Sequence, residues 1–314
     1  MTKSTLLRLS ALAFLVLLPM CTQEFDAVPP VGMVKAQDPE ADALLQKAEQ
    51  APSLKKSVSA LKELVMYHPL APCAPKARFM LGQCYEQKGD YREAFKEYGK
   101  LIDRYPQSPL YADALNRQLA MAMAGTHSQL KTPVLFGAWK VDMESGTVTK
   151  WLDEIMEKAP YNDMAATAAA TLGEYQVSLG QEEQARETYR RLVEKYPDSK
   201  YAPEAQLMVA QLWAQSHTRG DRNMTNLTAA REAYEEFNLR FPHHKDAGKA
   251  LSGAANMNRL MVQQELEMGR YYLERSREYK SAVFCFENVI RQKKVNPEAA
   301  AEAEALLARA RAGH

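Results

Sequence analysis

The chain has 314 residues, of which 46% are apolar and 25% are charged, and its 40 lysines and arginines nearly balance its 39 aspartates and glutamates. This is the composition of a globular protein, and it excludes wholesale disorder and a multi-pass membrane protein. Because there is no excess of positive charge, nucleic acid is not an expected partner. Only 14 residues are glycine, which favours helices and leaves little material for phosphate-binding loops.

The N-terminus has the pattern of an export signal. Lys3 and Arg8 precede the apolar run 9–20, which is too short to cross about 30 Å of hydrocarbon as a helix but suits the apolar core of a signal peptide. Residues 1–20 are therefore predicted to be a signal peptide. Residues 21–39 contain three prolines and one glycine and are predicted to form a flexible tether.

The end of the apolar run, Leu18-Pro19-Met20-Cys21, resembles a bacterial lipobox, with leucine at −3 and cysteine at +1. The resemblance implies that Cys21 carries lipid and anchors the protein to a membrane. The lipobox pattern has a small residue at −1, where this chain has Met20. Two alternatives therefore stay open: simple secretion after cleavage at Ala36, or an anchor that is not cleaved.

An internal repeat organises the rest of the chain. A small residue stands twelve positions before a turn proline in four places: Ser57 and Pro69, Ala94 and Pro106, Ala185 and Pro197, and Ala230 and Pro242. Gly89 and Gly180 each lie five residues before the key alanine, where a helix must end. A helix, a glycine turn, a second helix and a proline turn, repeated at roughly 34 residues, are typical of the tetratricopeptide repeat (TPR).

The repeat predicts an all-α fold, a right-handed TPR superhelical solenoid of about five to six helix pairs with a C-terminal capping helix. It forms a single unit over residues 40–314, with a long loop insertion at about 125–146. The expected helices lie at about 40–50 with 55–67, 75–88 with 91–104, 109–124 with 147–158, 163–179 with 182–195, 202–217 with 227–240, 247–277 with 280–293, and a cap at 297–311. Ala94 and Ala185 are expected to be buried where the two helices of a pair meet.

No catalytic or metal-binding pattern occurs in the sequence. The six histidines lack the spacing of zinc ligands, and neither a phosphate-binding loop nor a nucleophile elbow is found. Apart from Cys21 the cysteines are Cys73, Cys84 and Cys285, an odd number that argues for apolar packing over a disulfide framework. The sequence therefore predicts a protein that is not an enzyme and holds no metal or cofactor.

The C-terminal region carries a more specific resemblance. Phe241-Pro242, the segment 264–275 with its Tyr271-Tyr272 pair, and the segment 279–286 are similar to the outer-membrane assembly lipoproteins of the BamD type. The resemblance implies a lipid-anchored scaffold on the periplasmic face of the outer membrane, or alternatively a soluble periplasmic protein. Its implied partners are the periplasmic domain of a β-barrel insertase or other envelope proteins, and unfolded outer-membrane protein segments bound on the concave face.

Residues 270–294 are the expected partner-binding region, because they hold seven basic residues against three acidic ones. The candidate residues are Arg270, Arg275, Arg277 and Lys280. The BamD-type family typically carries arginine where this chain has Cys285, so its contact is expected to pass to Arg275 and Arg277, whose guanidinium groups suit carboxylates. The alternative function is that of a periplasmic TPR adaptor in a cell-division or Tol-type system, or of a secretin pilot lipoprotein.

Overall fold

The computed structural model describes residues 35–134, 139–160, 163–218 and 223–313. The predicted signal peptide, Cys21 and the greater part of the predicted tether lie outside the described residues.

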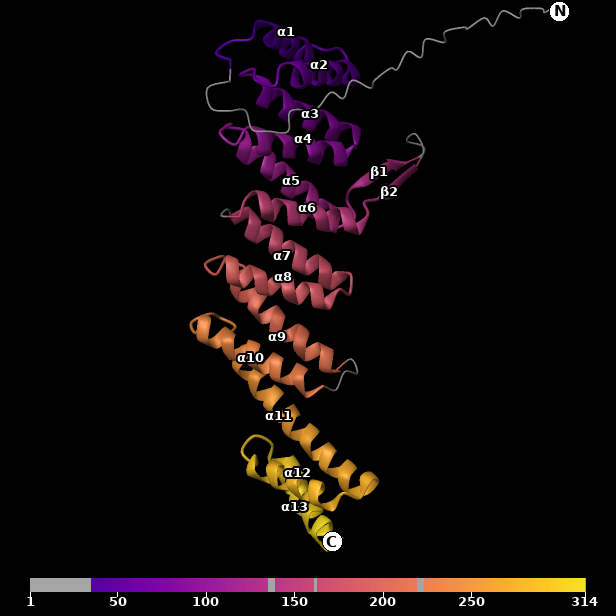
Figure 1. Ribbon diagram of the computed structural model, residues 1–314, viewed down its shortest axis with the longest axis vertical. Helices are drawn as coiled ribbons and strands as arrows, with labels where there is room; N and C mark the ends of the chain where they lie inside the picture. The colour runs from indigo at the N-terminus through magenta and orange to yellow at the C-terminus, as the bar shows by residue number, and fades with distance from the viewer. Residues whose placement is uncertain (1–34, 135–138, 161–162, 219–222, 314) are drawn as a thin grey trace, which may run out of the picture.

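The described residues form an elongated stack of six helix pairs that is closed by one further helix (Figure 1). The pairs are α1 (Pro39–Glu49) with α2 (Leu54–Tyr67), α3 (Ala74–Lys88) with α4 (Tyr91–Arg104), α5 (Tyr111–Thr126) with α6 (Ser145–Lys158), α7 (Asp163–Ser178) with α8 (Glu182–Lys195), α9 (Ala202–Thr218) with α10 (Met224–Arg240), and α11 (Ala247–Tyr271) with α12 (Tyr279–Arg291). The last helix, α13 (Pro297–Ala312), packs on α12. Each helix packs chiefly on its neighbours in the chain, so the predicted all-α TPR solenoid with a capping helix is confirmed.

Glycine ends the first helix of two pairs, as the repeat predicts. Gly89 and Gly180 adopt left-handed φ angles of 74° and 73°, which cost glycine little. After α3, the Asp90 N–H donates to the carbonyl of Tyr85, and the equivalent bond follows α7. These bonds close Schellman motifs and turn the chain sharply into the next helix.

Small residues set the distance between the helices of a pair. Ala94 and Ala185 are fully buried, as predicted from the sequence. On the first helix, a Cβ added to Gly173 would lie only 2.5 Å from the ring of Tyr189. The aromatic ring of the second helix thus occupies the space that any larger residue at Gly173 would need, and the two helices pack closely as a result.

The long helix α11 joins the last regular pair to the C-terminal cap. A tyrosine of α10 packs on Gly253 in its first half, and Phe286 of α12 packs on Gly269 in its second half. The helix does not continue to residue 277 as predicted. It changes to a π-helical turn at Tyr272–Ser276, and Arg277, with a φ of 55°, redirects the chain toward α12.

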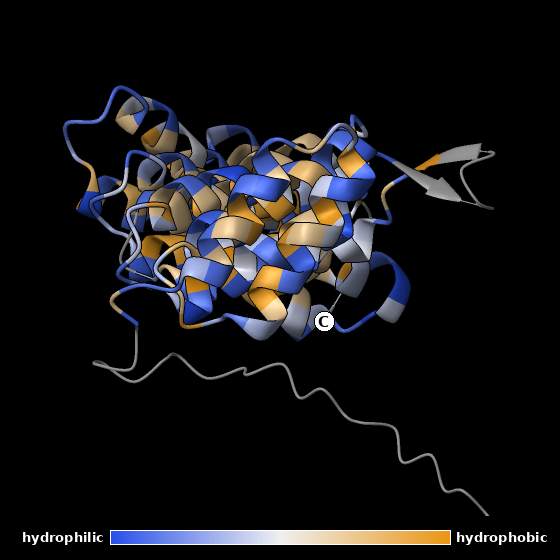
Figure 2. Cartoon of the chain, turned by 90° about the horizontal axis from the view of Figure 1, so that it is seen from above, coloured by the Kyte–Doolittle hydropathy of each residue, from blue (hydrophilic) through white to orange (hydrophobic). Residues whose placement is uncertain are grey.

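A two-stranded antiparallel hairpin lies between α5 and α6, within the stretch expected to be a loop. It consists of β1 (Lys131–Val134) and β2 (Trp139–Asp142). In both strands β-branched or aromatic residues occupy every second position, a period of two that suits strands and not helices. Seen from the side, the hairpin points away from the helical stack (Figure 1), and the view from above shows polar and apolar residues interspersed along the helices of the stack (Figure 2).

Candidate partner-binding surfaces

Of the four candidate residues, Arg270 is engaged within the protein. Its guanidinium donates to the carboxylate of Glu267 at 3.1 Å on the same helix and also donates to Glu302 of α13. Glu302 lies 32 residues away in the sequence, so this contact is not visible in the local charge pattern. Arg270 therefore holds α13 against α11 and offers little free charge to a partner.

Arg275, Arg277 and Lys280 lie close together in the chain at the junction of α11 and α12, and all three are exposed. None of them makes an ion pair with another residue in the part of the chain that the structure describes. The nearby Glu278 accepts hydrogen bonds from Ser276 and Ser281. Three of the four candidate residues are thus free to meet an acidic surface.

Cys285 points into the core, where it lies beside Gly269 with only 6% of its surface exposed. Burial raises the pKa of its thiol, which keeps it neutral and unreactive. The preceding residue, Phe284, is on the outside and 62% exposed. Phe284 follows Lys280 by four residues on α12, so the two share a helix face. The sequence analysis missed this exposed aromatic residue. The two residues that follow it, Cys285 and Phe286, are buried, which places Phe284 on the outer face of α12.

A groove of about 180 Å³ separates α7 from α9, the first helices of successive pairs. Apolar and aromatic residues form most of it, with one glutamate from each helix: Ala170, Glu174, Val177, Tyr189, Tyr201, Glu204, Ala205 and Met208. Burial raises the pKa of Tyr189, and the charges of Glu174 and Glu204 raise it further, which places both carboxylates near the phenol. The groove therefore offers an apolar floor with a negative rim.

A second, larger groove of about 710 Å³ runs along α8 and is also lined by residues of α6, α7 and α9. In it the guanidinium of Arg186 lies 4.0 Å above the ring of Trp213, and burial lowers the pKa of Arg186. Acidic and basic side chains alternate along this groove, for example Glu183, Glu187 and Arg190. Its charges largely compensate one another, so it selects no class of ligand by charge.

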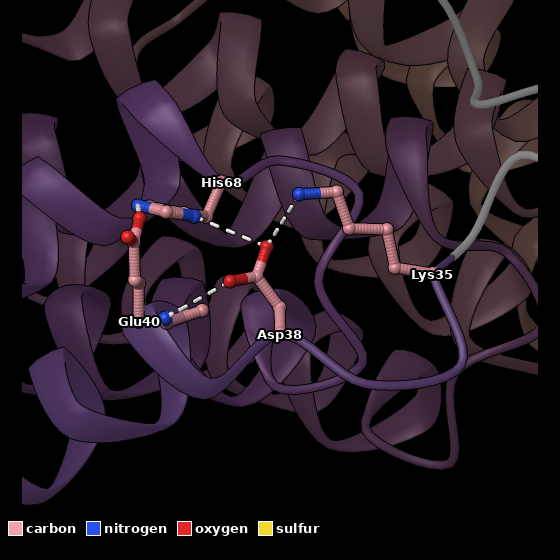
Figure 3. Close-up of polar contacts among 5 residues, drawn as sticks. Lys35, Asp38, Glu40 and His68 are labelled. Atoms are coloured by element: carbon pink, nitrogen blue, oxygen red, sulfur yellow. Dashed lines mark hydrogen bonds and ion pairs between the residues drawn. The ribbon is translucent and has the colours of Figure 1, made fainter.

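A polar cluster fixes the start of the solenoid (Figure 3). The carboxylate of Asp38 accepts hydrogen bonds from Lys35 Nζ at 2.8 Å, from His68 Nδ1 at 3.1 Å and from the N–H of Ala41 at 3.2 Å. The N–H of Lys35 also donates to the carbonyl of Leu70. Residues 35–38, which were expected to belong to the flexible tether, are therefore held against the first repeat.

Among the described residues, no group of three or more histidine, cysteine or acidic side chains is placed to bind a metal ion. Within the same residues, no helix has the length and apolar character needed to cross a membrane.

Three solved structures are similar to the chain in architecture. A tetratricopeptide repeat protein from Parabacteroides merdae is 14% identical, with 87% of this chain and 99% of that chain covered and a TM-score of 0.32. PilF of Pseudomonas aeruginosa is 15% identical over 86% and 99%, with a TM-score of 0.31. MamA from Desulfovibrio magneticus RS-1 is 15% identical over 67% and 99%, also with a TM-score of 0.31. These scores are too low to carry an argument about function.

Among curated proteins, no sequence matches the chain. Residues 38–215 match the family YfiO, which is described as outer membrane lipoprotein. The match covers the solenoid from the N-cap of α1 into α9 and ends before the C-terminal residues that resemble the BamD type. Because it spans more than half of the sequence, the chain belongs to the YfiO family of outer-membrane lipoproteins.

Proposed function

We propose that the chain is a non-enzymatic scaffold, anchored by lipid at Cys21 to the periplasmic face of the outer membrane, that binds the periplasmic domain of a β-barrel insertase. The observation that carries the proposal is the group of three exposed and unpaired cations, Arg275, Arg277 and Lys280, beside the exposed ring of Phe284.

This C-terminal surface has two features of a partner site. Unpaired cations attract an acidic partner and set its orientation, while each exposed ion pair adds only about 0.2–1 kcal/mol. Phe284 supplies apolar area that gains affinity when it enters a pocket on the partner, and such anchors carry most of the binding energy in many interfaces. The surface also lies at the end of the stack, where a folded domain can approach unhindered (Figure 1).

The groove between α7 and α9 supports binding of unfolded outer-membrane protein segments. Its volume of about 180 Å³ has room for a single large side chain, and its floor of Val177, Tyr189 and Met208 suits an apolar one. Glu174 and Glu204 at the rim favour a segment that also carries lysine or arginine. An extended chain can place one such side chain in the groove while its backbone stays accessible to other proteins.

A crosslinked pull-down from detergent-solubilised envelopes tests the proposal. The unaltered chain is expected to recover an insertase with folded periplasmic domains, and Arg275→Glu with Arg277→Glu is expected to lower that recovery at least about tenfold. Lys55→Glu with Lys56→Glu is the matched control, since both lysines are exposed on α2 at the other end of the stack. Circular dichroism should show equal helicity for all three chains.

Two outcomes would contradict the proposal. Full recovery of the insertase by the Arg275→Glu, Arg277→Glu chain would remove the C-terminal surface from the interface. Recovery of a peptidoglycan-associated protein or a secretin, with no insertase, would favour the alternative of a cell-division or Tol-type adaptor or a secretin pilot.

A further inference from the structure

A third groove, of about 470 Å³, lies between α4 and α6, the second helices of successive pairs (Figure 1). Near one end of this groove the guanidinium of Arg92 on α4 donates to the hydroxyl of Thr147 on α6 at 3.2 Å. Near the other end Lys158 of α6 donates to the carboxylate of Asp103 on α4 at 2.8 Å. The two helices therefore run in the same direction. The stretch of α4 from residue 92 to residue 103 makes the groove about 16 Å long, at 1.5 Å for each residue.

Buried aromatic rings form the floor of the groove. Phe95 and Trp151 stack with their ring centroids 4.5 Å apart, and they are 3% and 6% exposed. Gly99, which lies about one turn farther along α4, also lines the groove and adds no side chain to its floor. The charged side chains on the two walls therefore decide which class of partner the groove accepts.

These walls carry more positive than negative charge. The groove is lined by five basic and three acidic side chains: Arg92, Lys96, Lys100, Lys150 and Lys158 against Asp103, Glu144 and Glu154. Each of the three acids already has a basic partner. Asp103 and Glu154 both lie 2.8 Å from Lys158 Nζ, and Glu144 lies 3.6 Å from the guanidinium of Arg92. The excess charge of the groove is therefore positive, and it belongs to the remaining lysines.

Lys96 and Lys150 lie on opposite walls of the groove, and both are exposed. Neither makes an ion pair or a hydrogen bond with another side chain in the part of the chain that the structure describes. Lys96 follows Phe95 in the sequence and Lys150 precedes Trp151, so the two amino groups belong to the middle of the groove, beside the stacked rings. A cleft with an excess of one sign of charge concentrates groups of the opposite sign.

The cations of α4 have the spacing of side chains on an extended peptide. Arg92, Lys96 and Lys100 all line the groove and follow one another at intervals of four residues, which is about 6 Å along the helix axis. In an extended peptide every second side chain points to the same side, at intervals of about 6.6 Å. Acidic residues at alternate positions of such a peptide can each meet one of these cations, whereas a single phosphate or carboxylate cannot span them.

We propose that the groove between α4 and α6 binds an extended acidic segment of a partner protein, in which aspartate or glutamate occupies every second position. About five residues of such a segment fill the length of the groove. Lys96 and Lys150 bind its central carboxylate from the two walls, and Arg92 and Lys100 bind the flanking ones. This groove is separate from the C-terminal surface and from the groove between α7 and α9, so the inference does not depend on the proposed contact with an insertase.

Fluorescence anisotropy tests the proposal with a fluorescein-labelled peptide in which three glutamates alternate with serines. The full chain in non-ionic detergent is expected to bind this peptide, and the affinity should fall as the salt concentration rises. Lys96→Glu with Lys150→Glu is expected to lower the affinity at least about tenfold. Lys96→Arg with Lys150→Arg keeps both charges and should bind nearly as the parent does. Lys55→Glu with Lys56→Glu is the matched control, since it makes the same change of charge at exposed positions of α2.

Four outcomes would overturn the proposal. The first is a parent chain that does not bind the peptide, and the second is equal binding of a peptide with glutamine in place of glutamate. The third is an equal loss of affinity in the two lysine-to-glutamate pairs. The fourth is full binding by Lys96→Glu with Lys150→Glu but loss in Arg275→Glu with Arg277→Glu, which would assign the peptide to the C-terminal surface. Circular dichroism should show equal helicity for all variants, because the substituted lysines are exposed.

The order of the charges tests the extended arrangement separately. A peptide with the same three glutamates in one uninterrupted block has the same charge but loses the match to the spacing along α4. It is expected to bind several-fold more weakly than the alternating peptide. Equal affinity for the two peptides would overturn the extended arrangement.

Discussion

His68 donates a hydrogen bond from Nδ1 to the carboxylate of Asp38 at 3.1 Å, which ties the C-terminal end of α2 to the N-cap of α1. Nε2 of the same ring lies 3.9 Å from the carboxylate of Glu40. Lys35 completes the cluster with a second hydrogen bond to Asp38. Among the described residues no repeat precedes the first pair, and this cluster fastens the two helices of the pair at that end of the stack.

The cluster predicts an acid-sensitive contribution to stability. The hydrogen bonds from Lys35 and His68 hold the pKa of Asp38 well below its usual range. A carboxyl group whose pKa is depressed on folding stabilises the protein above its unfolded pKa of about 4, and this contribution is lost as the pH falls through the folded value. Asp38→Asn keeps the N-cap but removes the charge. It should lower the urea midpoint at pH 7, and the difference should shrink below pH 4.

Circular dichroism during urea unfolding at pH 7 and at pH 3 measures this effect. Asp198→Asn, at an exposed turn position, serves as the control and should leave the midpoint unchanged at both values. An Asp38→Asn chain as stable as the parent at pH 7 would mean that the cluster adds no stability.

The repeat register is tested by burying a charge. Ala185 is fully buried between helices, so Ala185→Glu should lower the free energy of unfolding by about 3 kcal/mol or more, because the carboxylate gains no partner. Ala120→Glu places the same residue at an exposed position of α5 and should change stability by about 0.5 kcal/mol or less. Similar urea midpoints for the two variants would show that the register is wrong.

Close helix packing at Gly173 gives a second test of the interior. A Cβ there would lie 2.5 Å from the Tyr189 ring, so Gly173→Ala should destabilise by about 1–3 kcal/mol despite the better helix propensity of alanine. Gly248→Ala, where an added Cβ meets nothing within 4 Å, should instead stabilise α11 by about 0.5–1 kcal/mol. Combining Gly173→Ala with Tyr189→Leu should recover part of the loss. A stabilised Gly173→Ala chain would contradict the packing described.

The sequence predicts most of the fold because residues close together in the chain specify where the helices of each repeat begin, end and pack. Gly89 and Gly180 end helices through their own backbone freedom, and Ala94 and Ala185 mark close contacts at a fixed distance from a turn proline. The hairpin at 131–142 was missed because it belongs to no repeat. The π-helical turn at 272–276 was missed because it depends on how α12 packs against α11 and not on a helix-ending residue.

The candidate site was predicted only in part, for a related reason. A count of charges along the chain identifies Arg270 and Arg275 equally well. Only the folded structure shows that Glu302 of α13 contacts Arg270. The same limit hides Phe284, since its exposure depends on Phe286 being the ring that packs on Gly269. Contacts between residues distant in sequence therefore decide which of the predicted cations remain free.

Lipid attachment at Cys21 predicts where the protein is found. Attached acyl chains contribute about 0.8 kcal/mol for each buried methylene group, so two or more chains hold a protein firmly on a membrane. The unaltered chain should therefore fractionate with membranes, and Cys21→Ala should move most of it to the periplasmic fraction. Metabolic labelling with a palmitate analogue gives an independent readout. An unaltered chain that is recovered unlabelled in the periplasmic fraction would exclude the anchor.

The buried ion pair between α3 and α4 gives the last prediction. Arg78 Nη1 donates to Glu97 at 2.8 Å, and the two side chains are 1% and 7% exposed. Arg78→Met should cost about 3–5 kcal/mol, because the buried carboxylate of Glu97 loses the guanidinium that lies 2.8 Å away. Arg78→Met with Glu97→Leu removes both charges from the interior and should recover most of the loss, since Lys100 can then turn toward water.

An exposed pair of similar geometry supplies the control for this test. Lys76 and Glu49 lie 2.7 Å apart between α3 and α1, but their side chains are 56% and 41% exposed. Lys76→Met should therefore change the free energy of unfolding by less than about 1 kcal/mol. If the loss in the Arg78→Met, Glu97→Leu chain equals or exceeds that of Arg78→Met alone, then the pair itself stabilises the α3–α4 contact beyond the cost of burying it. In that case the second repeat depends on its ion pair, and not on the apolar packing of its helices, for its stability.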